Sequence, residues 1–193
     1  MLGLALICAV VPYKNNRPGQ EKPSNLLGEM KSGSNSFSVD KVARFVVNND
    51  STMLLIDLRS PAEFQKFNIP GSVNIPYKDL LHKDFEGYLD QKEINKIFYG
   101  NGDIVANLAR TLCAGLGYQN LYVIQGGLND WFGKVMNSQF KGERITAQEN
   151  ALFETRFKAR KLFNEINSLP DSLKNQYIKV KKKDEKKLDG GCG

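Results

Sequence analysis

Short apolar runs alternate with amphipathic stretches across the middle of the chain, between residues 38 and 132. Three of these runs are continuously apolar and have the length of a strand that is covered on both faces of a parallel sheet. They are Met53-Leu54-Leu55-Ile56, Ile97-Phe98-Tyr99 and Leu121-Tyr122-Val123-Ile124. A shorter strand is expected at residues 73–76, where Pro76 closes it. Because segments with helical periodicity separate the runs, the pattern predicts an α/β fold with a mainly parallel central sheet.

The segments between the runs carry helix signals. Ser38 is a typical N-cap for a helix that ends near residues 48–50. A longer helix is predicted over residues 104–116, where leucines recur at four-residue spacing. These leucines are Leu108, Leu112 and Leu116, and Gly117 follows at the expected C-cap. Shorter helices are expected at residues 63–67, in pieces over residues 79–95, and around Trp131.

A further amphipathic helix is predicted over residues 146–169. Thr146 and Glu149 have the spacing of a capping box at its start, and Pro170 follows its end. Its apolar positions are Leu152, Phe153, Phe157, Ala159, Leu162, Phe163 and Ile166. We expect this helix to pack either onto the sheet domain or onto a partner.

The two ends of the chain differ from the middle in composition. Residues 1–12 are almost wholly apolar, but the run is shorter than the ~20 residues that span a bilayer and no positive charges precede it. We interpret it as the remnant of a membrane anchor or signal segment that starts upstream; the alternative is an exposed apolar terminus, which would favour aggregation. Residues 13–35 have the composition of a linker, and residues 170–193 that of a flexible, lysine-rich tail.

Composition and charge narrow the classes of function. The chain has 193 residues, 41% of them hydrophobic, which is enough for one packed domain of about 105 residues, expected at 36–140, with appendages. The net charge of +6 is concentrated at residues 179–187, in the tail. No aromatic RNA-binding signature is interleaved with these lysines, so we expect no nucleic-acid partner.

Cysteine and histidine are scarce. The three cysteines, Cys8, Cys113 and Cys192, are far apart, form no CxxC pair, and have no histidine near them, since His82 is the single one. We therefore predict no metal site and no other cofactor. A histidine-based catalytic triad is excluded on the same grounds unless His82 is its base.

Three motifs occur in order along residues 38–132. The first is Leu55-Ile56-Asp57-Leu58-Arg59-Ser60-Pro61-Ala62-Glu63-Phe64, the second is Ile69-Pro70-Gly71-Ser72-Val73-Asn74-Ile75-Pro76, and the third is Leu116-Gly117-Tyr118-Gln119-Asn120-Leu121-Tyr122-Val123-Ile124-Gln125-Gly126-Gly127 followed by Trp131. In this combination and spacing, the span resembles a rhodanese-like (sulfurtransferase) domain. The resemblance implies a three-layer sandwich in which helices flank the sheet.

The resemblance also implies a site, and this sequence departs from it. In the family, the loop after the central strand begins with a catalytic cysteine whose thiolate takes up sulfane sulfur as a persulfide. Counting back from Gly117 places Gly100 at that position, and glycine cannot act as a nucleophile. Asp103 adds a negative charge inside the loop. We therefore expect no autonomous sulfurtransferase activity, and interpret the loop as a pocket for an anion or for the thiol of a partner. Its residues are Gly100, Asn101, Gly102, Asp103, Ile104 and Val105.

Other conspicuous residues are assigned structural roles. By resemblance, Asp57 and Arg59 make hydrogen bonds at a strand end, Gly126 and Gly127 form a turn, and Trp131 anchors the core. Cys113 lies in the middle of a predicted helix beside apolar neighbours, which is typical of a cysteine that serves as a small buried hydrophobe.

Cys192 is the remaining candidate thiol. Glycines precede and follow it, and the lysine-rich segment before it favours both an extended chain and the thiolate form. This terminus resembles the swinging arm of the sulfur-oxidation carrier protein, Gly-Gly-Cys-Gly-Gly, without the final glycine. The alternative is an incidental cysteine in a disordered tail.

Three hypotheses follow for the function. The leading one is a non-catalytic, rhodanese-like protein of the bacterial cell envelope, membrane-associated or exported, that docks a sulfur-handling partner or transporter. Its Cys192 would carry sulfur as a persulfide or thiosulfonate. The second is a pure protein-interaction module, with the sheet domain and the helix at residues 146–168 as its binding surface. For the location of the protein, the alternative to the cell envelope is the cytoplasm. The third is a weak thiosulfate sulfurtransferase that works through Cys113.

Overall fold

The computed structural model describes residues 35–140, 146–177 and 179. The predicted apolar anchor at residues 1–12 lies outside the described residues, and so do almost all of the linker and the end of the tail that carries Cys192. No helix within the described ranges is both long enough and apolar enough to cross a bilayer.

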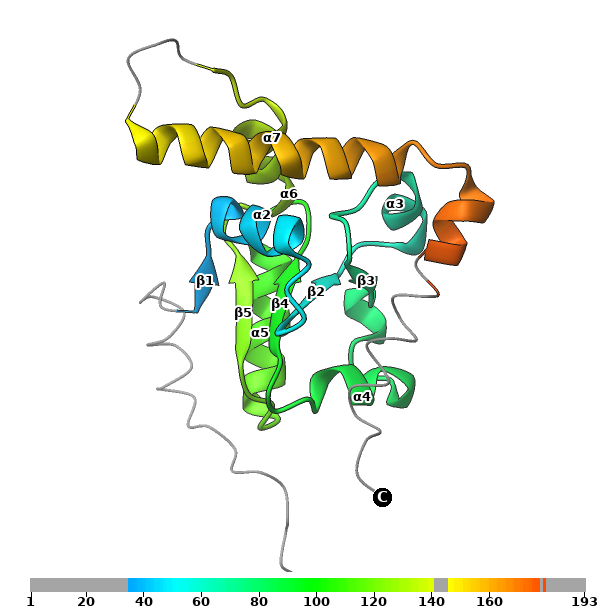
Figure 1. Ribbon diagram of the computed structural model, residues 1–193. Helices are drawn as coiled ribbons and strands as arrows, with labels where there is room; N and C mark the ends of the chain where they lie inside the picture. Colours follow the sequence, from blue (N-terminus) through cyan, green and yellow to red (C-terminus); the bar gives the residue numbers. More distant parts are fainter. Residues whose placement is uncertain (1–34, 141–145, 178, 180–193) are drawn as a thin grey trace, which may run out of the picture.

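A parallel five-stranded sheet forms the centre of the protein, in the order β1-β5-β4-β2-β3 (Figure 1). The strands are β1 (Ser36–Phe37), β2 (Met53–Asp57), β3 (Val73–Asn74), β4 (Asn95–Tyr99) and β5 (Leu121–Ile124). The predicted α/β class is confirmed, and β1 is an additional edge strand that the apolar pattern did not indicate. Asp57 and Tyr99 are register partners at the ends of β2 and β4, so the loops that follow these strands lie at one edge of the sheet.

One face of the sheet is covered by α5 (Ile104–Gly115), α4 (Glu86–Leu89) and the short turns η1 (Tyr77–Asp79) and η2 (Lys83–Phe85). Small side chains of α5, such as Ala106, Ala109 and Cys113, make its contact with the sheet. The helix ends as predicted near residue 116, where Gly117 adopts the left-handed conformation. The leucine series of this helix lies on the opposite, exposed side, with Leu108 47% exposed. The close approach of α5 to the sheet explains why alanine rather than leucine faces the core.

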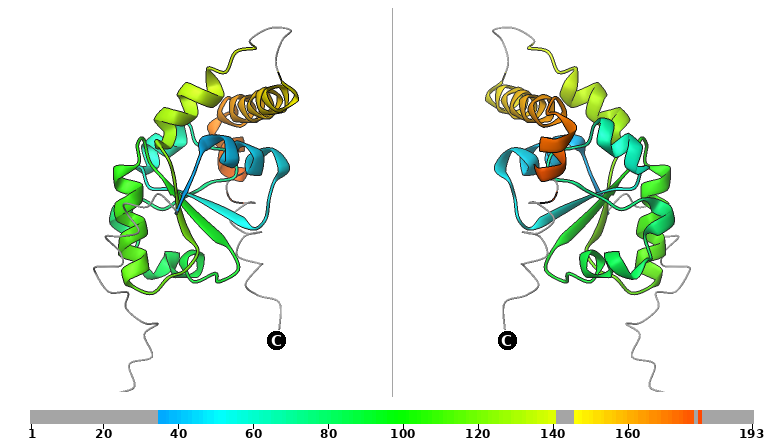
Figure 2. Two further views of the ribbon diagram at one scale, coloured as in Figure 1. Left: turned by 90° about the vertical axis from the view of Figure 1, so that its left-hand side faces the viewer. Right: turned by 90° about the vertical axis from the view of Figure 1, so that its right-hand side faces the viewer.

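The other face is covered by α2 (Val39–Asn48), α6 (Gly127–Asp130), the π-helical turn η3 (Trp131–Met136) and α7 (Ala147–Asn167). Figure 2 shows these helices and α5 on opposite sides of the sheet. Ser38 caps α2 as predicted, and α3 (Pro61–Lys66) lies beyond the ends of the strands (Figure 1). Trp131 is fully buried in this layer, with its ring centroid 6.3 Å from that of Phe163 on α7.

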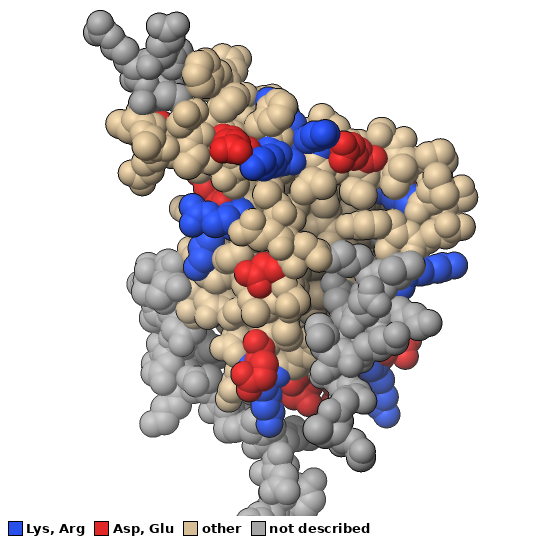
Figure 3. All heavy atoms as spheres, in the orientation of Figure 1, with Lys and Arg blue, Asp and Glu red and all other residues tan. Residues whose placement is uncertain are grey.

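Helix α7 packs onto the sheet domain, the first of the two alternatives predicted for it. The expected capping box between Thr146 and Glu149 begins the helix, and Arg156 pairs with Asp40 of α2 at 2.6 Å. On the face in Figure 3, acidic and basic side chains are interspersed along this helix. The i,i+4 pair Glu154–Lys158 is one instance. The exposed surface of α7 therefore has no block of a single charge in this view.

The chain after α7 is fixed to the end of α3. Lys174 is buried, and its Nζ donates to the backbone carbonyls of Gln65 at 2.6 Å and of Lys66 at 3.2 Å. Burial lowers the pKa of Lys174, and the neighbouring Asp171 partly offsets this. Asn167 exchanges hydrogen bonds with the backbone of Asn68, which follows α3. The C-terminal segment thus caps the last carbonyls of α3 with a cation, an arrangement that suits the negative end of a helix.

Candidate functional site

The candidate site is the loop that joins β4 to α5, at the carboxyl edge of the sheet. Gly100 follows the last residue of β4 and is buried, whereas Asn101 and Asp103 are exposed. The loop carbonyls are tied down from the neighbouring turn: the N–H of Leu128 donates to the Gly100 oxygen at 3.0 Å, and the N–H of Asn129 to the Asn101 oxygen at 2.9 Å. These bonds fix the loop through its acceptors.

The donors of the same loop have no such partners. Within the described ranges, no hydrogen bond uses a backbone N–H of residues 101–105 as its donor. Asp103 is the N-cap of α5, but its side chain makes no capping hydrogen bond. The positive end of the α5 dipole lies at the same place as these free donors. The loop is therefore suited to a negatively charged sulfur or oxygen atom.

Gly126 and Gly127 shape the loop from the turn after β5. Both have positive φ, +70° and +56°. A Cβ at position 127 would lie 2.6 Å from the Gly100 oxygen and 2.9 Å from the Gly102 oxygen. The loop can therefore lie this close to the turn only because residue 127 has no side chain.

Gly127→Ala is expected to lower the free energy of unfolding by about 2–4 kcal/mol, since it combines a left-handed backbone with a backbone clash. Urea unfolding would measure the loss. Gly87→Ala is the matched control: a Cβ there meets nothing within 4 Å, and its helical position predicts a neutral or slightly stabilising effect. Equal stabilities of the two variants would contradict the packing of residue 127 against the loop.

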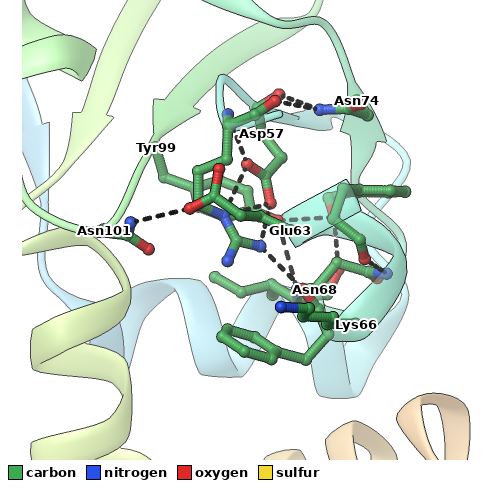
Figure 4. Close-up of polar contacts among 12 residues, drawn as sticks. Asp57, Glu63, Lys66, Asn68, Asn74, Tyr99 and Asn101 are labelled. Atoms are coloured by element: carbon green, nitrogen blue, oxygen red, sulfur yellow. Dashed lines mark hydrogen bonds and ion pairs between the residues drawn. The ribbon is translucent and has the colours of Figure 1, made fainter. Parts of the chain in front are cut away.

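Glu63 of α3 reaches the same loop. Its Oε1 accepts a hydrogen bond from Asn101 Nδ2 at 3.3 Å, as Figure 4 shows. Its Oε2 accepts from the Ser60 hydroxyl at 2.6 Å and from the Ser60 N–H at 3.1 Å, which forms a capping box. These bonds, together with the one from Asn101, lower the pKa of Glu63, so its carboxylate is ionised at neutral pH.

Asp57 is the last residue of β2, Arg59 lies between β2 and α3, and both are buried. Arg59 Nη2 is 2.7 Å from Asp57 Oδ2 and 2.8 Å from the Phe67 carbonyl oxygen. Burial acts to lower the pKa of Arg59, but the hydrogen bonds and the charge of Asp57 outweigh it, and the net pKa is raised. The pair thus joins the end of β2 to Phe67, at the carboxyl end of α3.

Tyr99 connects the end of β4 to the turn before β3. Its hydroxyl donates to Ser72 Oγ at 2.8 Å and accepts from the Ile69 N–H at 3.3 Å. Burial raises the pKa of Tyr99 well above its usual value, so its hydroxyl stays protonated. This network fixes the carboxyl edge of the sheet on the side of the loop that faces β2 and β3.

Cys113 is fully buried on the sheet-facing side of α5, as predicted. Burial raises the pKa of its thiol to about 12, and the charge of the nearby Lys96 only partly opposes this. A thiol with this pKa is protonated and inaccessible, so it is a poor nucleophile.

Lys96 is the buried cation beside Cys113. Its Nζ donates to the Gln91 carbonyl oxygen, and burial lowers its pKa from 10.5 to about 8. At pH values between about 8 and 10.5, Lys96 is protonated in the unfolded chain but largely deprotonated in the folded chain. The free energy of unfolding should therefore rise as the pH increases from about 8 to about 10.5.

Comparison with Lys96→Met isolates this effect. The variant is expected to be more stable than the parent at about pH 7.5, with its advantage shrinking by about 1–2 kcal/mol at about pH 9.5. Urea unfolding at the two pH values measures this difference, in which the titration of all other groups cancels. An advantage that stays constant with pH would contradict the depressed pKa of Lys96.

The structure places some of the site residues predicted from the sequence at the loop and others elsewhere. It brings residues 100–105 together with Gly126 and Gly127, and leaves Cys113 in the core, away from solvent. Within the described ranges, no cluster of three or more His, Cys, Asp or Glu side chains could hold a metal ion. Cys192 lies outside the described residues. Sequence reasoning missed Glu63 as a neighbour of the loop; its spacing from Ser60 predicts the capping box but not the contact with Asn101.

Comparisons with known proteins agree with this architecture. The family model of the rhodanese-like domain matches residues 38–134. The thiosulfate:glutathione sulfurtransferase of Saccharomyces cerevisiae is 30% identical over 109 residues, which cover 50% of this chain and 76% of that protein. A mitochondrial thiosulfate sulfurtransferase of the same yeast is 25% identical over 108 residues, covering 51% and 72% of the two chains.

Solved structures give similar matches. The human single-domain sulfurtransferase has a TM-score of 0.44 and 22% identity, over 52% of this chain and 97% of that chain. A Bacillus halodurans protein has a TM-score of 0.49 and 18% identity, over 67% and 97%. The match to the family model spans half of the chain and coincides with the sheet and its loop. The protein therefore belongs to the rhodanese-like domain family.

Proposed function

We propose that this protein is a non-catalytic member of its family that docks a sulfur-handling partner or transporter and carries sulfur on Cys192. The observation that carries the proposal is the loop at Gly100, which has free backbone donors and a fixed shape but no thiol. On this assignment, Gly100 stands where the family has its nucleophile. The loop then holds a sulfur atom that belongs to another group.

The carrier step would be a nucleophilic exchange at sulfur. The Cys192 thiolate attacks the outer sulfur of a donor persulfide, forms a new S–S bond, and releases the donor as its thiolate. With thiosulfate as donor, the S–S bond of thiosulfate breaks and sulfite leaves with the electron pair. Neither route needs an oxidant, because the sulfane sulfur moves at its own oxidation level.

The position of the C-terminal segment supports this proposal. Lys174 is anchored at one end of α3, and Glu63, nearer the other end, contacts the loop. The chain from Lys174 to Cys192 could span several tens of ångströms at ~3.4 Å per residue. A thiol at this place in the sequence is therefore within reach of the loop and of a partner docked there. For the apolar residues 1–12, we propose a role as a tether to the cell envelope.

Incubation with thiosulfate or a persulfide donor, followed by intact-mass measurement, tests the carrier proposal. We expect the parent protein to gain the mass of one sulfur atom and Cys192→Ser to gain none. Cys113→Ser is the matched control and should behave as the parent, since Cys113 is buried with a raised pKa. An adduct that survives Cys192→Ser would refute the arm, and no adduct with any donor would refute carriage. A cyanide-dependent sulfurtransferase assay of the parent and of Cys113→Ala tests the weak-enzyme hypothesis, and we expect no activity in either.

One observation favours the second candidate function, a protein-interaction module without sulfur chemistry. The exposed side of α5 is apolar and begins directly after the loop; it comprises Ile104, Val105, Leu108, Leu112 and Leu116. Ile104 is 76% exposed. Such a contiguous apolar surface is typical of an interaction site. Deleting residues 190–193 separates the two functions: loss of sulfur transfer with partner binding intact supports the carrier, and no effect supports the module.

A further inference from the structure

We propose that the loop at Gly100 selects its sulfur ligand by charge, taking a thiol or persulfide on a protein surface that combines apolar and basic residues in preference to a small multiply charged anion such as thiosulfate. This rests on the proposed docking function and names the class of ligand for the same site. The free backbone donors favour a sulfur atom with a single negative charge. The acidic side chains around them disfavour a ligand with two or more negative charges.

A fixed negative charge stands at the rim of the loop. The Glu63 carboxylate is held by three hydrogen bonds from Ser60 and Asn101, so it cannot turn away from the loop without losing its capping box. Asp103 lies within the loop, is exposed, and has no capping contact through its side chain. Two carboxylates thus flank the donors, and each repels an approaching dianion.

No cation in the same part of the chain offsets these charges. Residues 100–109 contain no lysine or arginine, and the next one, Arg110, is 2% exposed. Arg59 is close enough to Glu63 to affect its pKa, but Arg59 is buried and paired with Asp57 at 2.7 Å. On the turn that holds the loop, Asp130 is paired with Lys134, so this pair adds little net charge. Glu63 and Asp103 are therefore the charges on which the proposal for the loop rim rests.

The other side of the loop is uncharged. The exposed apolar series on α5 starts at Ile104, the first residue after Asp103, and continues to Leu108 and beyond. A free small anion would gain nothing from this surface. A partner protein would bury it, and basic side chains beside the partner's thiol would pair with Glu63 and Asp103. Both features of the rim thus favour a protein-borne sulfur.

A thiol placed in the loop can report this field. At Gly100 a Cβ would have the Gly102 oxygen, 3.7 Å away, as its nearest neighbour, so Gly100→Cys fits without strain. The test uses the full chain with Cys8→Ser and Cys192→Ser, leaving buried Cys113 in place. Two methanethiosulfonates of matched shape, one with a trimethylammonium group and one with a sulfonate group, react with this thiol. Each transfers its thioalkyl group to the thiolate and releases methanesulfinate.

The measured quantity is the ratio of the cationic to the anionic rate constant, divided by the same ratio for a small free thiol. We expect this normalised ratio to exceed one and to fall about three- to sixfold in Glu63→Gln and again in Asp103→Asn. Glutamine at position 63 keeps the capping box, so a structural effect alone would not move the ratio. Glu154→Gln, an exposed glutamate on α7, is the matched control and should leave the ratio unchanged. The effect should fade at about 1 M salt.

Each outcome decides between the alternatives. A normalised ratio at or below one, or a ratio insensitive to both substitutions, would overturn selection by charge while leaving the carrier function intact. Gly102→Cys serves as a second reporter should Gly100→Cys not fold, since a Cβ there has its nearest neighbour at 3.9 Å. A reporter thiol that reacts with neither reagent would overturn both the inference and the loop as a sulfur site. Sulfur uptake by Cys192 in the parent chain tests the carrier function independently.

Discussion

Gly100→Cys is expected to convert the loop into a persulfide-forming site, with sulfur uptake at least about 100-fold above the parent loop, which has no nucleophile. The free N–H groups at residues 101–105 and the α5 dipole should lower the pKa of the introduced thiol, so that it is a thiolate at neutral pH. The measurement is intact mass after incubation with a small organic persulfide, in a chain that also carries Cys192→Ser. The thiolate takes the outer sulfur of this donor, and the donor leaves as its thiolate. The transfer of the added sulfur to cyanide as thiocyanate provides the rate.

Gly100→Ser is the matched control for this gain. Its side chain has nearly the same size and makes the same demand on the loop, but it has no thiol. The site assignment would be wrong if Gly100→Cys folds, as judged by circular dichroism, and takes up no more sulfur than Gly100→Ser. With thiosulfate as donor the gain should be smaller, because Glu63 and Asp103 repel a dianion.

The sheet and its helices could be predicted from local signals. Continuous apolar runs such as residues 53–56 belong to strands that are covered on both faces, and caps such as Ser38 and Thr146 act over three or four residues. The edge strand β1 could not be predicted this way, because its two residues form a strand only through their pairing with β5. Local pattern carries no information on such a pairing.

The surroundings of the loop were harder to predict for the same reason. Glu63 is separated from Asn101 by 38 positions, and Lys174 from Gln65 by 109, so only the folded chain reveals these contacts. The leucine spacing of α5 predicts a helix, but it does not say which face of that helix meets the sheet. That face is set by the need for small residues such as Ala106 and Ala109 where the helix lies close to the strands.

The C-terminal extension and the loop are joined through α3, which lies between them. Lys174 binds the last carbonyls of α3, and Asn167 binds the backbone of Asn68, two residues beyond its end. Glu63, in the first turn of α3, contacts Asn101. The extension lies beyond residues 38–134, which match the family model, so a part of the chain outside the matched domain contacts α3. The position of α3 is therefore the feature on which the loop rim depends.

Asp57→Ala is expected to lower the free energy of unfolding by about 3–5 kcal/mol, because it leaves the buried guanidinium of Arg59 without its carboxylate partner. The loss should reach the loop, since Arg59 also binds the Phe67 carbonyl and lies over the Phe67 ring at 4.9 Å, which fixes the end of α3. Urea unfolding measures the stability. The normalised reagent ratio of a Gly100→Cys thiol should fall as Glu63 loses its fixed position.

Two comparisons make this prediction specific to a buried pair. Asp40→Ala breaks the Asp40–Arg156 pair, whose side chains are about one quarter exposed, and should cost only about 1 kcal/mol. The double variant Asp57→Ala/Arg59→Met removes both buried charges and should recover much of the lost stability, because the main penalty is the unpaired charge rather than the missing bond. If Asp57→Ala cost no more than Asp40→Ala, Arg59 would have to reach solvent or another acceptor, and α3 would not depend on Asp57 for its position.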